Sequence, residues 1–345
     1  MSTLPEPDPL NPEDSGAPVE AHTPIPPPRE NLSMEAWPSR SMPAEPAYTP
    51  DETPAPPAPV VEPLLFQSFA QPPVRPPARI PNFGHLCFLL LLGVIGFVCT
   101  AALVLLAMHF HLFGWERSLK SATDVRFILA SEGILYIFTF GFSLLVFPLF
   151  WNESFFAGIQ WRGTVALKRY KPLVGVALVC LGLAAIDGTL MPGPPNAPIE
   201  TMLRAPGAAW LMFGFGITIA PFFEEMFFRG FLLPALCTAW DWASERVNRK
   251  PALPLDANGH PQWSITAMAV ASVLTSLPFA LVHVAQQGHA LGPFLLLIVV
   301  SLILCAVRLK TRSLASSTLV HACYNFFIFS LALIGTGGFR HLDKF

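Results

Sequence analysis

Acidic residues and histidines inside long apolar runs are the part of this sequence best suited to chemistry. The run 221–230 holds Glu224, Glu225 and Arg229 among phenylalanines. A charge at membrane depth costs about 2.5–3.5 kcal/mol, so such residues are candidates for function. On a helix, Glu225 and Arg229 share a face, which predicts a structural ion pair. Glu224 points about 100° away, and two neighbouring carboxylates in different environments can take different roles.

Two later apolar runs add polar groups that complement Glu224. His283 lies near the end of one run, and His321 and Asn325 lie four residues apart on one face of another. Glu224 can take a proton from a water molecule. His321 and Asn325 can donate hydrogen bonds to a developing oxyanion. Together these residues are the parts of a hydrolase that has no covalent nucleophile.

Other chemistries fit the same residues less well. Two histidines and a glutamate are also the ligand set of a hydrolytic zinc centre. The sequence has no His-Glu-x-x-His motif, so we expect no cofactor and keep zinc as the alternative. No serine lies in a Gly-x-Ser-x-Gly context, which disfavours a serine triad.

The three groups also differ in expected depth. At about 1.5 Å per residue, His283 lies near the outer end of its run and His321 toward the inner end of its own. Glu224 lies near the middle. Convergence therefore requires helix ends that differ by a turn from those expected, or a shift of one span along the membrane normal.

Composition identifies the class of protein. Of the 345 residues, 52% are hydrophobic and 13% are charged, and the mean hydropathy is +0.50. These values exclude an ordinary soluble enzyme and indicate a polytopic membrane protein. The basic residues after position 63 lie in short loops, where they orient helices in a membrane rather than bind nucleic acid. Six cysteines lie in apolar runs without a Cys-x-x-Cys pair, so we expect neither disulfides nor a Cys-rich zinc site.

The apolar runs predict an all-α transmembrane bundle of about seven or eight spans. A span needs about 20 residues. Runs of suitable length cover 86–112, 127–150, 172–190, 264–285, 291–308 and 314–335, and a longer run covers 208–240 as one tilted helix or two short spans. With seven crossings, twelve Lys and Arg side chains lie on one side and six on the other. This favours a cytoplasmic amino terminus in the cell membrane.

We divide the chain into four parts by composition. Residues 1–81 carry 23 of the 37 prolines and predict a disordered acidic tail that is no signal peptide. Residues 82–200 form the first transmembrane helices, 201–335 the catalytic core, and 336–345 a short tail. We expect Glu132 to lie near the headgroups, and the cluster from Arg308 to Arg312 to form a solvated loop.

Three ordered motifs give the sequence a family resemblance. Glu224-Glu225-x-x-x-Arg229 leads into 230–234, Phe279-x-x-x-His283 follows, and His321-x-x-x-Asn325 comes last. Each motif lies on a separate apolar run. The segment 208–332 thereby resembles the CPBP family of intramembrane proteases, which includes type II CAAX prenyl endopeptidases and bacterial Abi or bacteriocin-immunity proteins.

The resemblance implies an α-helical membrane endopeptidase. In it, Glu224 activates the attacking water and His283 assists, His321 and Asn325 form the oxyanion site, and Glu225 and Arg229 support the structure. The expected partners are membrane lipid and a protein or peptide substrate, with prenylated CAAX proteins among the candidates, and no nucleic acid. Three alternatives stay open: a non-catalytic scaffold or immunity protein of the same fold, a zinc-dependent protease, and a proton-coupled transporter with Glu224 as the relay.

Overall fold

Helices form all the regular structure in the part of the chain that the structure describes. The computed structural model describes residues 80–112, 124–194, 197–205, 207–256 and 260–340. These residues all belong to one unit of the chain, Gln71–Phe345. The predicted all-α class is therefore confirmed. The proline-rich tail predicted for 1–81 lies outside the described residues up to position 79, as does 341–345 of the carboxyl-terminal tail.

Six helices are long and apolar enough to cross a membrane. They are α1 (Phe83–His109), α3 (Val125–Trp151), α6 (Tyr170–Leu190), α11 (Ile265–Val284), α12 (Leu291–Thr311) and α13 (Leu314–Gly335). Their ends fall within about three residues of the predicted runs, because a continuous apolar stretch and the length needed to span lipid set the same limits. The chain is a multi-pass integral membrane protein.

Polar residues at the helix starts explain where these spans begin. Asn82 forms a capping box with His85 at the start of α1. The hydroxyl of Ser264 accepts a hydrogen bond from the amide of Ala267 at the start of α11, and Ser313 does the same for Ser316 at α13. Each cap satisfies an amide that the first helical turn leaves unpaired.

The long run after residue 207 folds into bent helices that form either one broken span or a re-entrant loop, and we refer to them as the bent span. It comprises α8 (Ala208–Ile217), α9 (Ile219–Glu225), the π-helix η2 (Met226–Leu232) and α10 (Leu233–Val247). The bend between α8 and α9 measures 40°. Pro221 has no amide hydrogen to donate to the carbonyl of Ile217, which weakens the helix at this point. With the bent pair counted once, the described residues contain seven candidate spans.

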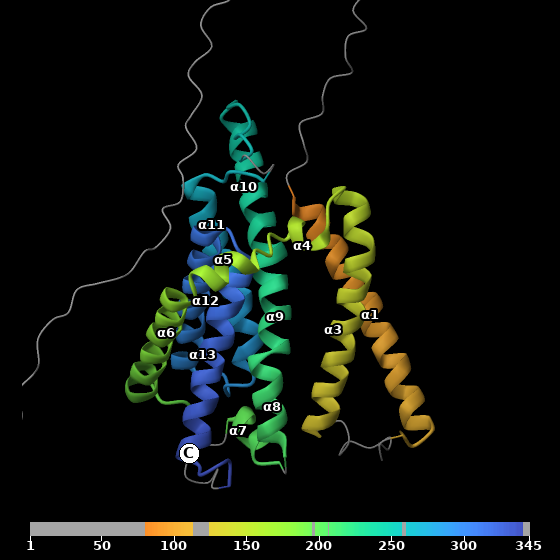
Figure 1. Ribbon diagram of the computed structural model, residues 1–345, viewed down its shortest axis with the longest axis vertical. Helices are drawn as coiled ribbons and strands as arrows, with labels where there is room; N and C mark the ends of the chain where they lie inside the picture. Colours follow the sequence, from red (N-terminus) through yellow and green to blue (C-terminus); the bar gives the residue numbers. More distant parts are fainter. Residues whose placement is uncertain (1–79, 113–123, 195–196, 206, 257–259, 341–345) are drawn as a thin grey trace, which may run out of the picture. The chain divides into compact units, whose positions relative to one another are not determined.

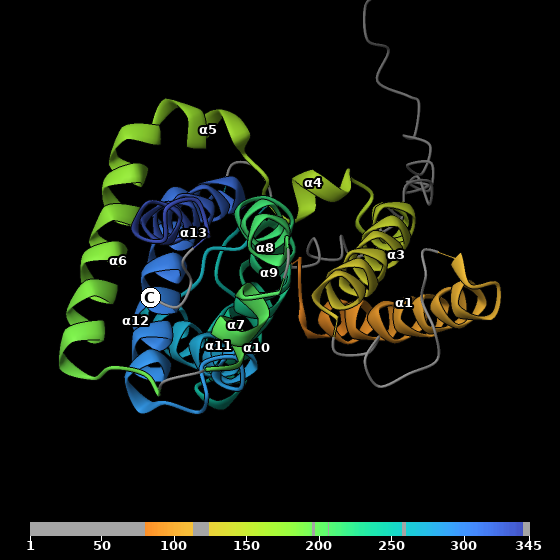
Figure 2. The ribbon, with the colours of Figure 1, turned by 90° about the horizontal axis from the view of Figure 1, so that it is seen from below.

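The bent span lies between two groups of helices (Figures 1 and 2). On one side α1 packs against α3; on the other, α13 contacts α6, α12 and α8. The short helices α4 (Phe155–Gly158) and α5 (Gly163–Lys168) connect α3 to α6, and α7 (Pro198–Leu203) connects α6 to α8. An aromatic cluster of Phe147, Phe155 and Phe231 fills the space between α3, α4 and η2. This packing holds η2 in place beside Glu224.

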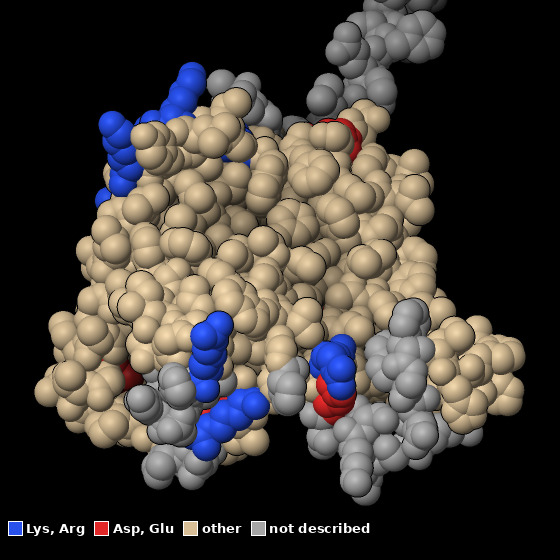
Figure 3. All heavy atoms as spheres, turned by 60° about the horizontal axis from the view of Figure 1, so that its bottom comes forward, with Lys and Arg blue, Asp and Glu red and all other residues tan. Residues whose placement is uncertain are grey.

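The surface agrees with a lipid environment. Large apolar side chains are exposed along the long helices, among them Val94 and Phe97 of α1 at 61% and 63%. Figure 3 shows a broad surface without charged side chains between the charged residues at its two ends. In water such exposure would be costly, whereas lipid tails solvate it.

One predicted loop residue is buried instead. Arg308 was expected in a solvated loop, but it lies in the last turn of α12 and is 1% exposed. The reason is that α12 continues to Thr311, past the predicted end of the run. Arg312, just after the helix, is exposed as expected and pairs with Asp256 at 2.7 Å.

Candidate active site

Glu224 meets two histidines from other helices. It lies at the end of α9, and its Oε2 is 3.6 Å from Nε2 of His283 in α11 and 3.7 Å from Nε2 of His321 in α13. Both distances exceed those of a normal hydrogen bond. Oε2 is buried and has no hydrogen-bond partner in the described part of the chain. The structure therefore brings three predicted site residues together around a carboxylate oxygen that still needs a donor.

The other nitrogen of each ring is held by an acceptor. His283 Nδ1 lies 2.8 Å from the carbonyl oxygen of Phe279, and His321 Nδ1 lies 3.1 Å from Oε1 of Glu225. A carbonyl and a carboxylate only accept, so each Nδ1 carries the hydrogen and donates it. In a neutral ring Nε2 is then an acceptor, and it faces Glu224. A bridging water molecule can donate to these acceptors, and a protonated ring can donate from Nε2.

Glu225 and Arg229 form the ion pair that their spacing predicts. Arg229 Nη1 donates to Glu225 Oε1 at 2.8 Å, and neither side chain is exposed to solvent. Arg229 Nη2 also donates to the hydroxyl and the carbonyl oxygen of Ser301 in α12, at 2.7 and 3.1 Å. The guanidinium stacks over the ring of Phe279 at 4.5 Å. Through His321 and Ser301, the pair connects α9 and η2 to both α12 and α13.

Asn325 has a structural contact that the sequence did not indicate. Its amide nitrogen donates to the carbonyl oxygen of Gly216 at 2.8 Å. Gly216 lies near the end of α8, where the bend interrupts the helical hydrogen bonds. Among the described residues, Asn325 makes no hydrogen bond to Glu224, His283 or His321. One amide hydrogen therefore supports the bend, and the second remains for another acceptor.

Residues of the three sequence motifs contact one another around Glu224 and Glu225. A comparison with known protein families points to the same segment of the chain. Residues 206–327 match the family model described as type II CAAX prenyl endopeptidase Rce1-like. This segment is similar to that family, and we refer to residues 206–327 as the CPBP segment. The match covers about a third of the chain and includes every predicted site residue from Glu224 to Asn325. Over this segment the chain therefore resembles intramembrane peptidases of the general CAAX-protease type. No curated protein and no solved structure matches the chain.

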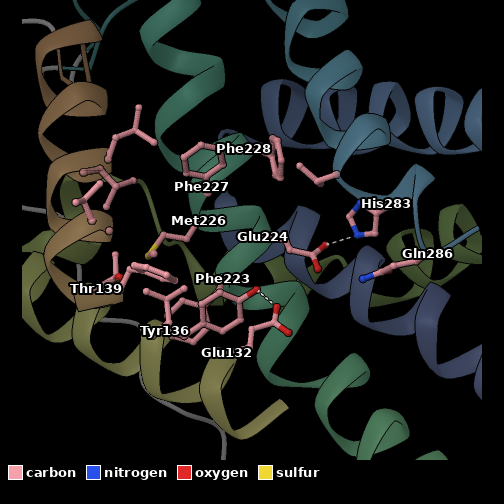
Figure 4. A pocket seen from close by; sticks show the side chains of 17 residues that line it. Glu132, Tyr136, Thr139, Phe223, Glu224, Met226, Phe227, Phe228, His283 and Gln286 are labelled. Carbon is pink, nitrogen blue, oxygen red and sulfur yellow. Dashed lines mark hydrogen bonds and ion pairs between the residues drawn. The ribbon is translucent and has the colours of Figure 1, made fainter. Parts of the chain in front are cut away.

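A cavity of about 590 Å³ adjoins the network of the CPBP segment. Its walls come from α1, α3, α9, η2 and α11, and they are mostly apolar. Figure 4 shows Glu224 and His283 on one side of this space, with Glu132 and Tyr136 beside them. Thr139 and Gln286 supply further polar groups. The cavity therefore offers an apolar environment that ends at the carboxylate of Glu224.

Glu132 lines the cavity, and its carboxylate accepts a hydrogen bond from the Tyr136 hydroxyl at 2.5 Å. An acid inside an apolar run, with a donor four residues later, follows the same spacing rule as Glu225 and Arg229. The expected position of Glu132 near the headgroups stays a prediction. Its place beside Glu224 depends on how α3 packs against the cavity.

The contact between Glu132 and Tyr136 has a measurable energy. We expect Tyr136→Phe to lower the free energy of unfolding by about 1–2 kcal/mol, because the carboxylate loses its donor. Glu132→Gln is not suitable for isolating the contact, because its amide oxygen can still accept a hydrogen bond from the Tyr136 hydroxyl. A double-mutant cycle therefore uses Glu132→Leu, Tyr136→Phe and the double variant beside the wild type. The measurement is thermal or chemical denaturation of the four proteins in detergent. Additive effects of the two changes would show that the contact contributes nothing.

Side chains that bind metals do not cluster in threes in the part of the chain that the structure describes. These residues contain no set of three or more His, Cys, Asp or Glu side chains arranged to hold a metal ion. All six cysteines are free, and Cys180, Cys237 and Cys305 are buried.

Proposed function

We propose that this protein is an endopeptidase in which Glu224 activates water to hydrolyse a peptide bond within the membrane. One observation carries the proposal: a buried carboxylate oxygen without a donor faces two imidazole nitrogens at the edge of an apolar cavity. A water bound there would donate to Glu224 and to an Nε2 atom. Burial of these groups away from bulk water strengthens their hydrogen bonds and limits side reactions.

The reaction follows general acid–base chemistry. Glu224 takes a proton from the bound water, and the resulting hydroxide oxygen forms a bond to the carbonyl carbon of the scissile peptide. His283 accepts a hydrogen bond from the water and orients it. When the tetrahedral intermediate collapses, the carbon–nitrogen bond breaks and Glu224 returns its proton to the leaving amine. A carboxylic acid and an amine are the products, and Glu224 is again ionised.

The developing oxyanion needs donors on the opposite side of the carbonyl carbon. His321 can donate to the oxyanion from Nε2 in its doubly protonated form, while its Nδ1 is held by Oε1 of Glu225. Asn325 contributes the amide hydrogen that Gly216 does not use. Glu225 and Arg229 position His321 rather than touch the substrate. Two such donors are typical of oxyanion stabilisation.

The cavity favours a membrane-associated substrate. Leu90, Val94 and Phe97 of α1 line it and are at the same time among the exposed residues that face lipid. An apolar peptide segment, or a lipid chain attached to one, can therefore leave the bilayer and reach Glu224 without crossing water. We infer that the substrate is a membrane-bound protein or peptide, with lipidated proteins among the candidates.

The basic residues support an orientation for this reaction. Arg246 lies in the last turn of α10, Lys310 in the last turn of α12, and Lys168 and Arg169 at the end of α5. Ser313 and Leu314 donate hydrogen bonds to the carbonyl oxygens of Arg162 and Gln160, which joins the start of α13, directly after α12, to the segment before α5. By the positive-inside rule, we infer that this end faces the cytoplasm, and with it the amino terminus.

A zinc-dependent version of the same protease is the second candidate. The observation in its favour is that both Nδ1 atoms contact an acceptor, which is the arrangement found behind histidines that bind metals. In a glutamate mechanism we expect hydrolysis to survive complete removal of divalent metal. The test is the hydrolysis of a panel of apolar and prenylated peptides by the purified protein in detergent, followed by mass spectrometry, with and without a strong chelator.

The outcomes of this test separate the candidates. Cleavage that continues in chelator supports the glutamate mechanism. Cleavage that stops in chelator and returns with Zn²⁺ alone replaces it with the zinc mechanism. If no peptide is cleaved, although a melting transition shows that the same preparation is folded, the result favours the non-catalytic scaffold or immunity function.

A further inference from the structure

Arg308 is a buried charge without an adequate partner. It is 1% exposed, and its one hydrogen bond within the described residues runs from Nη2 to the carbonyl oxygen of Ile159 at a long 3.5 Å. Its Nε and Nη1 have no hydrogen-bond partner there. An unpaired guanidinium in a protein interior is strongly unfavourable, so a compensating anion is expected.

The neighbouring charges do not supply that anion. Arg162 and Arg312 lie close enough to repel the charge of Arg308. Glu225 lies close enough to attract this charge, but its carboxylate is already paired with Arg229 at 2.8 Å. Asp256 pairs with Arg312 at 2.7 Å, and Asp241 holds the cap of α11 through Ser264. Burial lowers the pKa of the nearby His260, so that ring is neutral at pH 7. The positive charge of the arginines is therefore not balanced by the side chains around them.

A small cavity lies where the missing anion would be. It has a volume of about 170 Å³, several times the roughly 30 Å³ share of one water molecule. Its lining includes Gln160, Trp263, Met268, Arg308, Leu309 and Arg312. Two guanidinium groups and an amide side chain thus border one space, and none of the described residues that line it carries a carboxylate. The space is large enough for a tetrahedral oxyanion and has donors for its oxygens.

We propose that this cavity binds a phosphate group between Arg308 and Arg312. Guanidinium groups bind phosphate oxygens through paired, charge-assisted hydrogen bonds, and bind them better than a point charge does. The cavity lies at the end of α12 that carries the basic residues, where a membrane span meets the headgroups. The phosphate can come from an anionic phospholipid or from solution. The site is separate from Glu224 and does not depend on peptidase activity.

The test is ligand-dependent thermal stability of the full chain in a non-ionic detergent. Inorganic phosphate is titrated at constant ionic strength set with chloride, and phosphatidylglycerol is titrated in a second series against phosphatidylcholine. Arg308→Met removes the buried charge and keeps the apolar stem. Lys310→Met is the matched control, because Lys310 lies on the same helix end but is exposed.

We expect a saturable rise of the melting temperature for the wild type and Lys310→Met, and none for Arg308→Met. A rise with inorganic phosphate identifies free phosphate as a sufficient ligand, and a rise with phosphatidylglycerol alone identifies a lipid headgroup. If Arg308→Met does not fold, Arg312→Gln is tested in its place. We expect the ligand concentration at the midpoint of its titration to be at least about tenfold higher than for the wild type. No saturable effect in the wild type, or equal effects in all variants, would overturn the proposal.

Discussion

Glu224→Gln is expected to lower peptide hydrolysis by about 10²–10⁴-fold, the usual contribution of a general base. The amide keeps the shape of the side chain but cannot accept a proton from water. The melting temperature should change little, because Oε2 of Glu224 makes no hydrogen bond that the substitution breaks. The measurement pairs turnover of a cleavable peptide with a melting curve in the same detergent.

Glu132→Gln is the matched control for this experiment. It makes the same chemical change on another carboxylate of the same cavity, and it keeps the contact with Tyr136. We expect it to retain activity within about tenfold, since it lacks the two facing histidines that Glu224 has. Full activity of Glu224→Gln would exclude Glu224 as the base. Equal losses in both variants would indicate a general effect of charge in the cavity.

Breaking the pair of Glu225 and Arg229 is expected to cost about 3–5 kcal/mol of folding stability. Glu225→Gln leaves a guanidinium with no exposure to solvent beside a neutral amide, although Ser301 still accepts from it. Arg229→Ala leaves the carboxylate with His321 as its remaining partner. Both variants should show a lower melting temperature or poor expression, and activity should fall because His321 loses its support.

Two further variants make this prediction specific. The double variant Glu225→Gln, Arg229→Met should be less destabilised than the sum of the single changes, because it leaves no buried charge unpaired. Arg126→Ala removes an exposed pair with Asp124, where 69% of the Arg126 side chain is exposed, and should change stability by no more than about 1 kcal/mol. If Glu225→Gln folds normally but is inactive while Glu224→Gln is active, the two roles are reversed.

Much of the site follows from spacing within single helices. Residues four apart on a helix meet wherever that helix lies, so Glu225 and Arg229 could be paired from the sequence alone. The same rule applied to Glu132 and Tyr136 would have paired them too. The helix bounds were also predictable, because a membrane span has a minimum length and its polar caps stand at its ends.

Contacts between helices were harder to predict from the sequence than contacts within one helix. Asn325 was assigned from its position near His321, yet one of its donors serves the carbonyl of Gly216, more than a hundred residues earlier. Arg308 was placed in a loop, because a charge after an apolar run normally marks the end of a span. Only packing against the segment of Ile159 shows that it is buried.

The sequence by itself determined which residues are candidates for the chemistry and on which helices they lie. It could not determine their depth. The bounds of α11 and α13 agree with the predicted runs to within about one residue, yet His283, expected near the outer end of its run, and His321, expected toward the inner end of its own, both contact Glu224. The helices must therefore be displaced or tilted relative to one another. Apolar periodicity specifies which residues a helix can bury, whereas its shift along its neighbours depends on how their side chains interlock, and this only the tertiary structure decides.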